Sequence, residues 1–186
     1  MYQGNNPAAM RSQEWLCDAL LALMQKKPYA NISVKELCEK AGVSRQTFYQ
    51  LFGDKSEIVR FYFERMFHSY LETMKNLSPL TMTELIWQFY SMVEAHEKGL
   101  LLLLKNGIHI DGDEAFFCCL RELEQQLDIQ DPPIVQCYFT NFLGGALGHL
   151  ACGWLKNGKE LSKAEITAMT EYLLAGKWFS LGSGNP

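Results

Sequence analysis

The sequence predicts an all-α fold, in which a small N-terminal domain of three helices precedes a larger helical domain. Five segments begin with Ser, Thr or Asp followed three residues later by Glu, which is the capping-box pattern of helix starts. Asn-Gly and Asp-Gly pairs fall where helices are expected to end, rather than between alternating apolar runs, so hairpins are not indicated. The chain has 186 residues, 48% of them hydrophobic, which is enough to bury a sizeable core.

The elements follow from these caps and from apolar residues spaced at three and four positions. The capping patterns run from Ser33 to Glu36, Asp54 to Glu57, Thr81 to Glu84, Asp111 to Glu114 and Ser162 to Glu165. Helices are predicted at residues 11–26, 33–41, 44–51, 54–76, 81–97, 98–106, 112–127, 132–156 and 162–180. We expect residues 1–10 and the last seven residues, SLGSGNP, to form disordered tails.

Composition narrows the function classes. The net charge is -4, yet residues 1–65 hold nine Lys and Arg against seven Asp and Glu, so the first third is the basic part. The six cysteines show no paired zinc spacing and are read as reduced thiols. No signal peptide is visible, and the longest leucine run is far below the roughly 20 residues of a membrane span. We therefore expect a cytoplasmic protein.

Residues 33–51 have the pattern of a helix-turn-helix. Gly42 supplies the open backbone of a sharp turn between two short helices. In the second helix the inward positions are Phe48, Leu51 and Phe52, and the polar side chains of Arg45, Gln46, Tyr49 and Gln50 point outward, with Ser44 and Thr47 at the exposed amino end. Arg, Gln, hydroxyl and phenol groups on a helix of this kind can reach base edges and phosphates in a major groove.

The segment ISVKELCEKAGVSRQTFYQLFGDKSEIVRFYFERM, from Ile32 to Met66, resembles the DNA-binding domain of the tetracycline-repressor (TetR/AcrR) family. The resemblance implies a DNA-binding domain at 1–53 and a helical effector-binding and dimerisation domain at 54–186. It also implies phosphate contacts by Tyr49 and Lys55. Base-edge contacts are implied for Ser44, Arg45, Gln46 and Thr47. Tyr29 and Lys35 are further phosphate candidates.

The operator, a pseudo-palindromic double-stranded DNA, cannot be taken from the family, because position 46 is commonly small there and is Gln46 here.

Helix 132–156 carries apolar pairs at every fourth position, and this stripe circles too far for one neighbour to cover. Three glycines in the same helix would allow another helix to approach closely. Together with helix 162–180, they predict a homodimer through a four-helix bundle, as the resemblance also implies. The expected interface residues are Phe142, Gly145, Gly148, Trp154, Met169 and Leu173. The alternative is that these residues form an intrachain core.

The resemblance further implies a repressor released by a small-molecule effector. The expected pocket lining comes from helices 54–76 and 81–97, with Tyr62, Met66, Tyr70, Trp87 and Tyr90, although such stripes are more often core than pocket. Helix 54–76 is expected to carry the switch because it joins the two domains.

Two alternatives stay open: a regulator controlled by a protein partner, and a helical protein-interaction module without DNA binding.

An enzyme is not indicated. The four histidines are scattered and match no catalytic motif. His149 and Cys152 could form half of a metal site, but no second pair at ligand spacing accompanies them. The acidic run HIDGDE fits charge at a helix start better than a calcium loop. We expect no catalytic residue, no cofactor and no metal.

Overall fold

The computed structural model describes residues 1–2, 4–77, 81–109, 114–126 and 132–176, and all regular structure in these ranges is helical. The N-terminal head, as we call α1 to α3 with the short 3-10 helix between them, comprises α1 (Pro7–Met24), η1 (Tyr29–Asn31), α2 (Val34–Ala41) and α3 (Arg45–Leu51). The larger part comprises α4 (Ser56–Lys75), α5 (Met82–Ala95), α6 (Glu97–Lys105), α7 (Glu114–Gln126), α8 (Pro133–Lys156) and α9 (Lys163–Leu174). The predicted all-α fold is confirmed.

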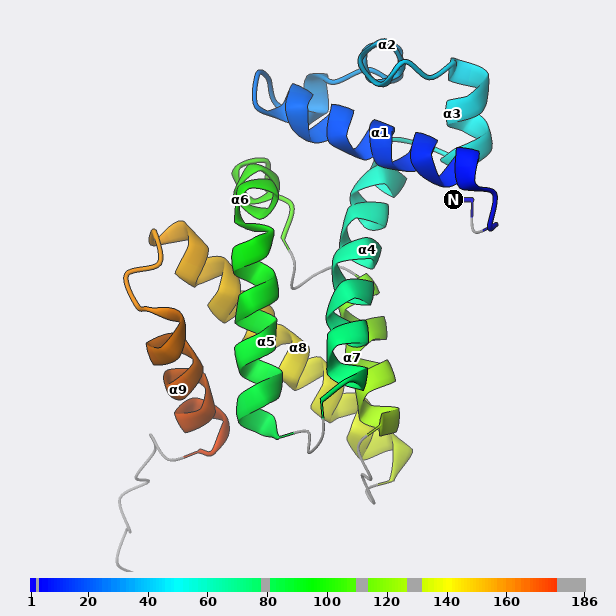
Figure 1. The fold of residues 1–186 in the computed structure, drawn as a ribbon. Coiled ribbons are helices and arrows are strands. Elements are labelled where there is room, and N and C mark those ends of the chain that lie inside the picture. The colour runs from blue at the N-terminus through cyan, green and yellow to red at the C-terminus, as the bar shows by residue number, and fades with distance from the viewer. Residues whose placement is uncertain (3, 78–80, 110–113, 127–131, 177–186) are drawn as a thin grey trace, which may run out of the picture.

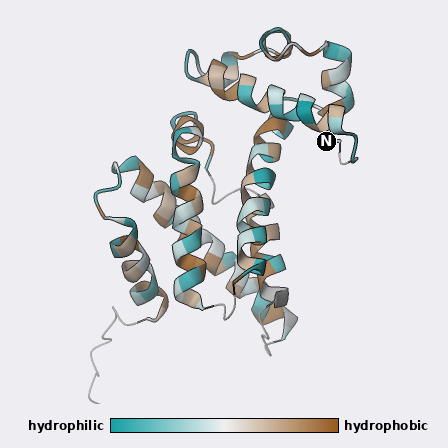
Figure 2. Cartoon of the chain, viewed as in Figure 1, coloured by the Kyte–Doolittle hydropathy of each residue, from teal (hydrophilic) through white to brown (hydrophobic). Residues whose placement is uncertain are grey.

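Helix α4 leaves the head and runs the length of the larger part (Figure 1). Helix α7 packs along α4 and α8, and α9 packs along α5. Teal and brown segments alternate along α4 and α5, as expected for helices with one apolar face (Figure 2). A single cluster of buried apolar side chains extends from the head into the larger part. The boundary at 53/54 therefore stays a prediction.

Capping decides where several helices begin. Ser33 and Glu36 form a reciprocal capping box at α2, and Ser162 and Glu165 form one at α9. The Thr81 side chain accepts a hydrogen bond from the Glu84 amide at the start of α5. Three of the five predicted patterns thus act at helix starts as expected, whereas Asp111 lies outside the described residues.

The start of α4 differs from the prediction. Asp54 Oδ1 accepts hydrogen bonds from the amides of Ser56 and Glu57, but the helix begins at Ser56 rather than at residue 54. The Glu57 carboxylate accepts from the amide of Gly53 at 2.8 Å, not from that of Asp54. The two acidic side chains still satisfy free amides at this helix start, through a different set of hydrogen bonds.

The expectation of a disordered tail at residues 1–10 is wrong for much of this segment. Helix α1 begins at Pro7, because Asn6 caps it and proline is well suited to a first helical position. The Tyr2 amide donates to the Leu51 carbonyl at 2.7 Å, which attaches the segment to the end of α3. At the other end, α9 stops at Leu174, and the expected tail from Ser180 lies outside the described residues.

Among the described residues, no helix combines the length and the apolar character that crossing a membrane would require.

Candidate nucleic-acid interface

Helix α3 is held from one side only. Phe48, Leu51 and Phe52 are buried to 3% exposure or less, as the spacing predicted. The ring of Phe48 packs at an angle of 49° against that of Phe52, with centroids 6.1 Å apart. These apolar contacts fix the helix while leaving its opposite side to solvent.

The opposite side carries the predicted polar groups. Arg45, Gln46 and Gln50 are exposed, and Tyr49 retains 61% of its surface while its ring meets the edge of Phe48. Ser44 accepts a hydrogen bond from the Thr47 amide at 3.0 Å and so caps the helix. The structure thus brings all the predicted α3 residues to one exposed end and face of a seven-residue helix.

The turn before α3 depends on Gly42, whose φ of 67° lies in the left-handed region that favours glycine. Its amide donates to the Cys38 carbonyl and closes α2. Two helices joined by this turn have the geometry of a helix-turn-helix.

Lys55 does not point freely towards solvent. Its ammonium group donates to the carbonyl oxygens of Tyr29, Ala30 and Ile32 at 2.8, 3.1 and 3.0 Å. It also lies 4.5 Å from the centroid of the Tyr29 ring. Because an ammonium group has three N–H donors, all of them are occupied, and Lys55 fastens the start of α4 to η1. The spacing of residues in the sequence carries no sign of these tertiary contacts.

The two remaining phosphate candidates differ in accessibility. Lys35 is exposed on α2, with its ammonium group 3.8 Å from the Glu39 carboxylate. Tyr29 is half-buried, and burial, with a further contribution from the Asp54 carboxylate, raises the pKa of its phenol. The Tyr29 amide donates to Asn106 Oδ1 of α6 at 2.7 Å, a contact between the head and the larger part that the sequence did not suggest.

A charged contact stabilises the start of α2. The Glu36 carboxylate pairs with Lys27 and accepts hydrogen bonds from the Ser33 amide and hydroxyl. The pKa of the Glu36 carboxyl group is lowered to about 2. The hydrogen bond from Lys27 is the largest cause, and the hydrogen bonds from Ser33 follow. The pair ties the end of the α1–η1 connection to the helix that precedes the turn.

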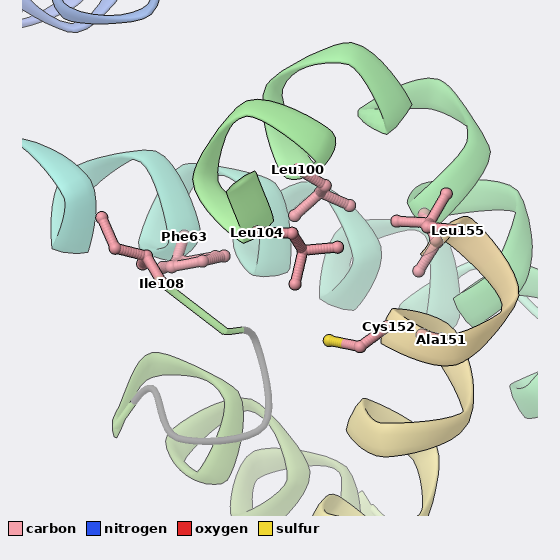
Figure 3. Close-up of a pocket in the computed structure, with 8 residues that line it drawn as sticks. Phe63, Leu100, Leu104, Ile108, Ala151, Cys152 and Leu155 are labelled. Atoms are coloured by element: carbon pink, nitrogen blue, oxygen red, sulfur yellow. The ribbon is translucent and has the colours of Figure 1, made fainter. Parts of the chain in front are cut away.

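The larger part contains a small apolar cavity between α4, α5, α6 and α8. Its volume is about 10 Å³, roughly the space of one water molecule. Leu104, Leu155 and Cys152 point towards one another across it (Figure 3). The lining residues are Phe63, Val93, Leu100, Leu104, Ile108, Ala151, Cys152 and Leu155.

None of the five expected pocket residues lines this cavity. Met66 is fully buried in the core, and the Tyr62 phenol donates to the His96 carbonyl at 3.3 Å. Tyr70 borders a second, apolar void of about 40 Å³ between α4, α5, α7 and α8. Burial raises the pKa values of Tyr62 and Tyr70.

Trp87 and Tyr90 were expected to line a pocket between α4 and α5. Both instead lie on the side of α5 that packs against α9. The Tyr90 hydroxyl lies 2.8 Å from the Thr170 hydroxyl, and Lys163 lies over the Trp87 ring at 4.4 Å. Sequence periodicity showed that α5 is amphipathic but not which helix would cover it.

An apolar face is exposed on the first half of α8. Ile134, Tyr138 and Phe142, four residues apart, retain 64%, 72% and 63% of their surface, and Val135 and Phe139 lie beside them. Of the expected interface residues, Phe142 lies on this face, Gly145 has open space at its Cα, and Met169 and Leu173 are half-buried on α9.

Trp154 and Gly148 were expected at an interface and are instead buried within the chain. The Trp154 indole N–H donates to the Leu161 carbonyl at 2.7 Å, and its ring packs on Tyr90. Gly144 also serves an intrachain contact, since a Cβ there would lie 2.8 Å from the Phe117 ring of α7. The second half of α8 therefore belongs to the core of the chain, where α8 contacts α6, α7 and α9.

Within the described residues, no group of three or more His, Cys, Asp and Glu side chains could hold a metal ion.

Comparisons with known proteins agree with this architecture. Residues 16–60 match the family model described as "Bacterial regulatory proteins, tetR family". No curated protein matches the chain.

Three solved structures resemble the whole chain. Lin0861 from Listeria innocua has a TM-score of 0.77 at 16% identity, covering 95% of this chain and 96% of its own. FadR from Thermus thermophilus, a TetR-family transcriptional repressor in complex with lauroyl-CoA, has a TM-score of 0.61 at 17% identity, covering 94% and 98%. The dihydroxyacetone kinase operon activator DhaS has a TM-score of 0.57 at 18% identity, covering 89% and 95%. At these identities the likeness concerns the fold.

Proposed function

We propose that this chain, whose residues 16–60 match the family model "Bacterial regulatory proteins, tetR family", is a sequence-specific DNA-binding regulator of transcription. The observation that carries this proposal is helix α3, whose buried side is apolar and whose exposed side holds only groups able to bind DNA. The side chains of Arg45, Gln46, Tyr49 and Gln50 lie together on this exposed side.

We assign roles from accessibility. Arg45 and Gln46 are exposed at the start of α3 and suit guanine and adenine edges, respectively. Tyr49 and Lys35 are exposed and suit phosphate oxygens, and Ser44, Thr47 and Gln50 lie within the same face. Lys55 has no free N–H donor for a phosphate, so its proposed role is to hold η1 in place and to add positive charge near the DNA.

The active form is proposed to be a homodimer. The exposed face on α8 offers Ile134, Tyr138 and Phe142, and Gly145 leaves open space for a second helix. A two-fold dimer would place two α3 helices in successive major grooves, about 34–36 Å apart on a pseudo-palindromic operator.

A small apolar effector is proposed to control DNA binding. The cavity between α6 and α8 is lined by apolar side chains only, which suits an aliphatic chain. One protein of the same fold is a repressor in complex with lauroyl-CoA. Since about 10 Å³ cannot hold such a chain, entry requires α6 to move relative to α8. We propose that the protein represses transcription when it binds its operator and that the effector releases it from the DNA. We place this activity in the cytoplasm.

The test is a selection of genomic DNA fragments by the purified full chain. We expect enrichment of one pseudo-palindromic sequence by the wild type and loss of that enrichment for Arg45→Ala. Lys98→Ala is the matched control, because it also removes an exposed positive charge but from α6, outside the proposed interface. Equal enrichment by Arg45→Ala and the wild type, or enrichment of no sequence, contradicts the proposal.

A further inference from the structure

The short helix η1 (Tyr29–Asn31) is one of the places where the head meets α6, beside the contacts between α1 and α6. The Tyr29 amide donates to Asn106 Oδ1 at 2.7 Å, although the two residues are 77 positions apart. The same carboxamide donates through Nδ2 to the Leu102 carbonyl at 2.8 Å. Because Asn106 is the C-cap residue of α6, its side chain joins the last turn of α6 to the first amide of η1.

The opposite end of η1 is held by α4. Lys55 donates to three carbonyl oxygens of the segment from Tyr29 to Ile32. The first amides and last carbonyls of a helix have no partner within it, so a three-residue helix depends on outside partners. Asn106 supplies the partner at the amino end and Lys55 supplies partners at the carboxyl end.

This arrangement bears on α3 through a short stretch of chain. Buried Ile32 and the capping residue Ser33 follow η1 directly and begin α2, which leads through Gly42 into α3. On the other side, Leu104 and Ile108, two positions before and after Asn106, line the apolar cavity. One carboxamide thus links the wall of the cavity to the chain that sets the position of α3.

We propose that Asn106 is a positioning residue for DNA binding: its hydrogen bond to the Tyr29 amide, together with the packing of α1 on α4 and α6, fixes the orientation of the head relative to α6. Asn106 touches no DNA in this account. It preorganises the head, and its loss lets the head sample more orientations, only some of which fit an operator. The proposal rests on the proposed DNA-binding function.

The first measurement is hydrogen exchange of the Tyr29 amide in the free protein, which needs no DNA. Asn106→Ala should speed exchange at Tyr29 by about 2- to 10-fold, the range expected for one lost hydrogen bond. Asn106→Asp keeps the acceptor for the Tyr29 amide but loses the Nδ2 donor to the Leu102 carbonyl, so it should restore only part of the protection. Asn76→Ala is the matched control, because Asn76 also caps a helix and donates to an i−4 carbonyl, that of Glu72 at 2.7 Å, so this hydrogen bond stays within α4.

The second measurement is affinity for the duplex returned by the fragment selection, at several salt concentrations. Asn106→Ala should weaken binding by about 2- to 10-fold with an unchanged salt slope, since no phosphate contact is lost, and Asn106→Asp should recover part of the affinity. Melting temperatures of Asn106→Ala and Asn76→Ala should agree closely, which separates positioning from general stability.

Three results would overturn the proposal: unchanged exchange at Tyr29, the same affinity loss in Asn76→Ala, or a salt slope reduced by about 1, which would make Asn106 a phosphate contact. If no variant binds any DNA, the proposed function fails, and the positioning role fails with it. The exchange result still shows independently whether the Asn106 hydrogen bond holds η1.

Discussion

The ammonium group of Lys55 uses its three donors on backbone carbonyls, so in this conformation it supports the interface rather than forming part of its free surface. Tyr49 is the opposite case, since its ring edge is packed while most of its surface remains open. The sequence predicted both residues as phosphate contacts because it shows residue types and spacing. Which acceptors surround a side chain depends on segments distant in the sequence.

Replacing Lys55 should therefore lower stability. Lys55→Ala removes three hydrogen bonds from a charged donor, and we expect the free energy of unfolding to fall by about 1.5–3 kcal/mol. Lys35→Ala is the control, because Lys35 is exposed and forms only a long ion pair with Glu39. Urea unfolding measures both. Equal stability of the two variants would show that the Lys55 contacts contribute nothing.

Removing the hydroxyl group of Tyr49 should weaken DNA binding without changing stability. Tyr49→Phe keeps the packed ring and loses the hydroxyl, so we expect affinity for the selected duplex to fall by about 2- to 10-fold and the melting temperature to stay the same. Tyr172→Phe, which removes a phenol hydroxyl from an exposed tyrosine of α9, serves as the comparison. An unaltered affinity for Tyr49→Phe would remove Tyr49 from the interface.

The Glu36 carboxylate should make part of the stability dependent on acid. Its pKa is lowered from 4.5 to about 2, chiefly by the hydrogen bond from Lys27, so its contribution is complete above pH 4.5 and is lost as the pH falls towards 2. Glu36→Gln should lower the melting temperature at pH 6 and flatten its dependence between pH 4.5 and 2. The same steepness in the variant and the wild type would contradict this assignment.

At the level of helices, prediction succeeded where a signal is local. Ser33, Thr81 and Ser162 cap helices as their spacing indicated, because a cap depends on neighbouring residues only. The start of α1 was missed although Asn6 and Pro7 form a recognisable cap. The cavity lining was missed for another reason: most of it comes from α6 and α8, and periodicity gives the apolar side of each helix but not which helices enclose a cavity.

Two neighbouring cysteines of α7 test which side of this helix faces the core. Cys119 is buried, which raises its pKa to about 12, whereas its neighbour Cys118 is exposed. Since the thiolate is the reactive form, iodoacetamide should modify Cys118 of the native protein much faster than Cys119. Buried Cys17, with a pKa also raised to about 12, should react as slowly as Cys119. Mass spectrometry of peptides after timed labelling reads out each site, and comparable rates at Cys118 and Cys119 would mean that α7 is turned differently.

At the level of the whole molecule, the proposed DNA-binding form contains two copies of the chain. The sequence showed that the apolar stripe of α8 exceeds what one neighbour can cover. The structure divides this stripe into a buried second half around Trp154 and an exposed first half around Tyr138. Sequence alone could not make this division, because both halves carry apolar pairs at the same four-residue spacing.

Charge placed on the exposed half should separate the copies. Phe142→Glu should shift the protein from dimer to monomer at micromolar concentration, because an unpaired carboxylate would be buried at the interface. Trp15→Glu is the control, since Trp15 of α1 is also about half exposed but lies in the head. Analytical ultracentrifugation distinguishes the two species. A wild-type monomer, or a dimeric Phe142→Glu, would place the contact elsewhere.

The most direct test of the central claim, that the exposed face of α3 reads base edges, is competition binding with single-base variants of the selected duplex. The account predicts that Gln46→Ala loses discrimination, by about 1–3 kcal/mol, at one base position in each half-site and keeps the wild-type preference at the others. A Gln46→Ala protein that discriminates among all base positions as the wild type does, with the same result for Arg45→Ala, would show that α3 does not read the DNA sequence.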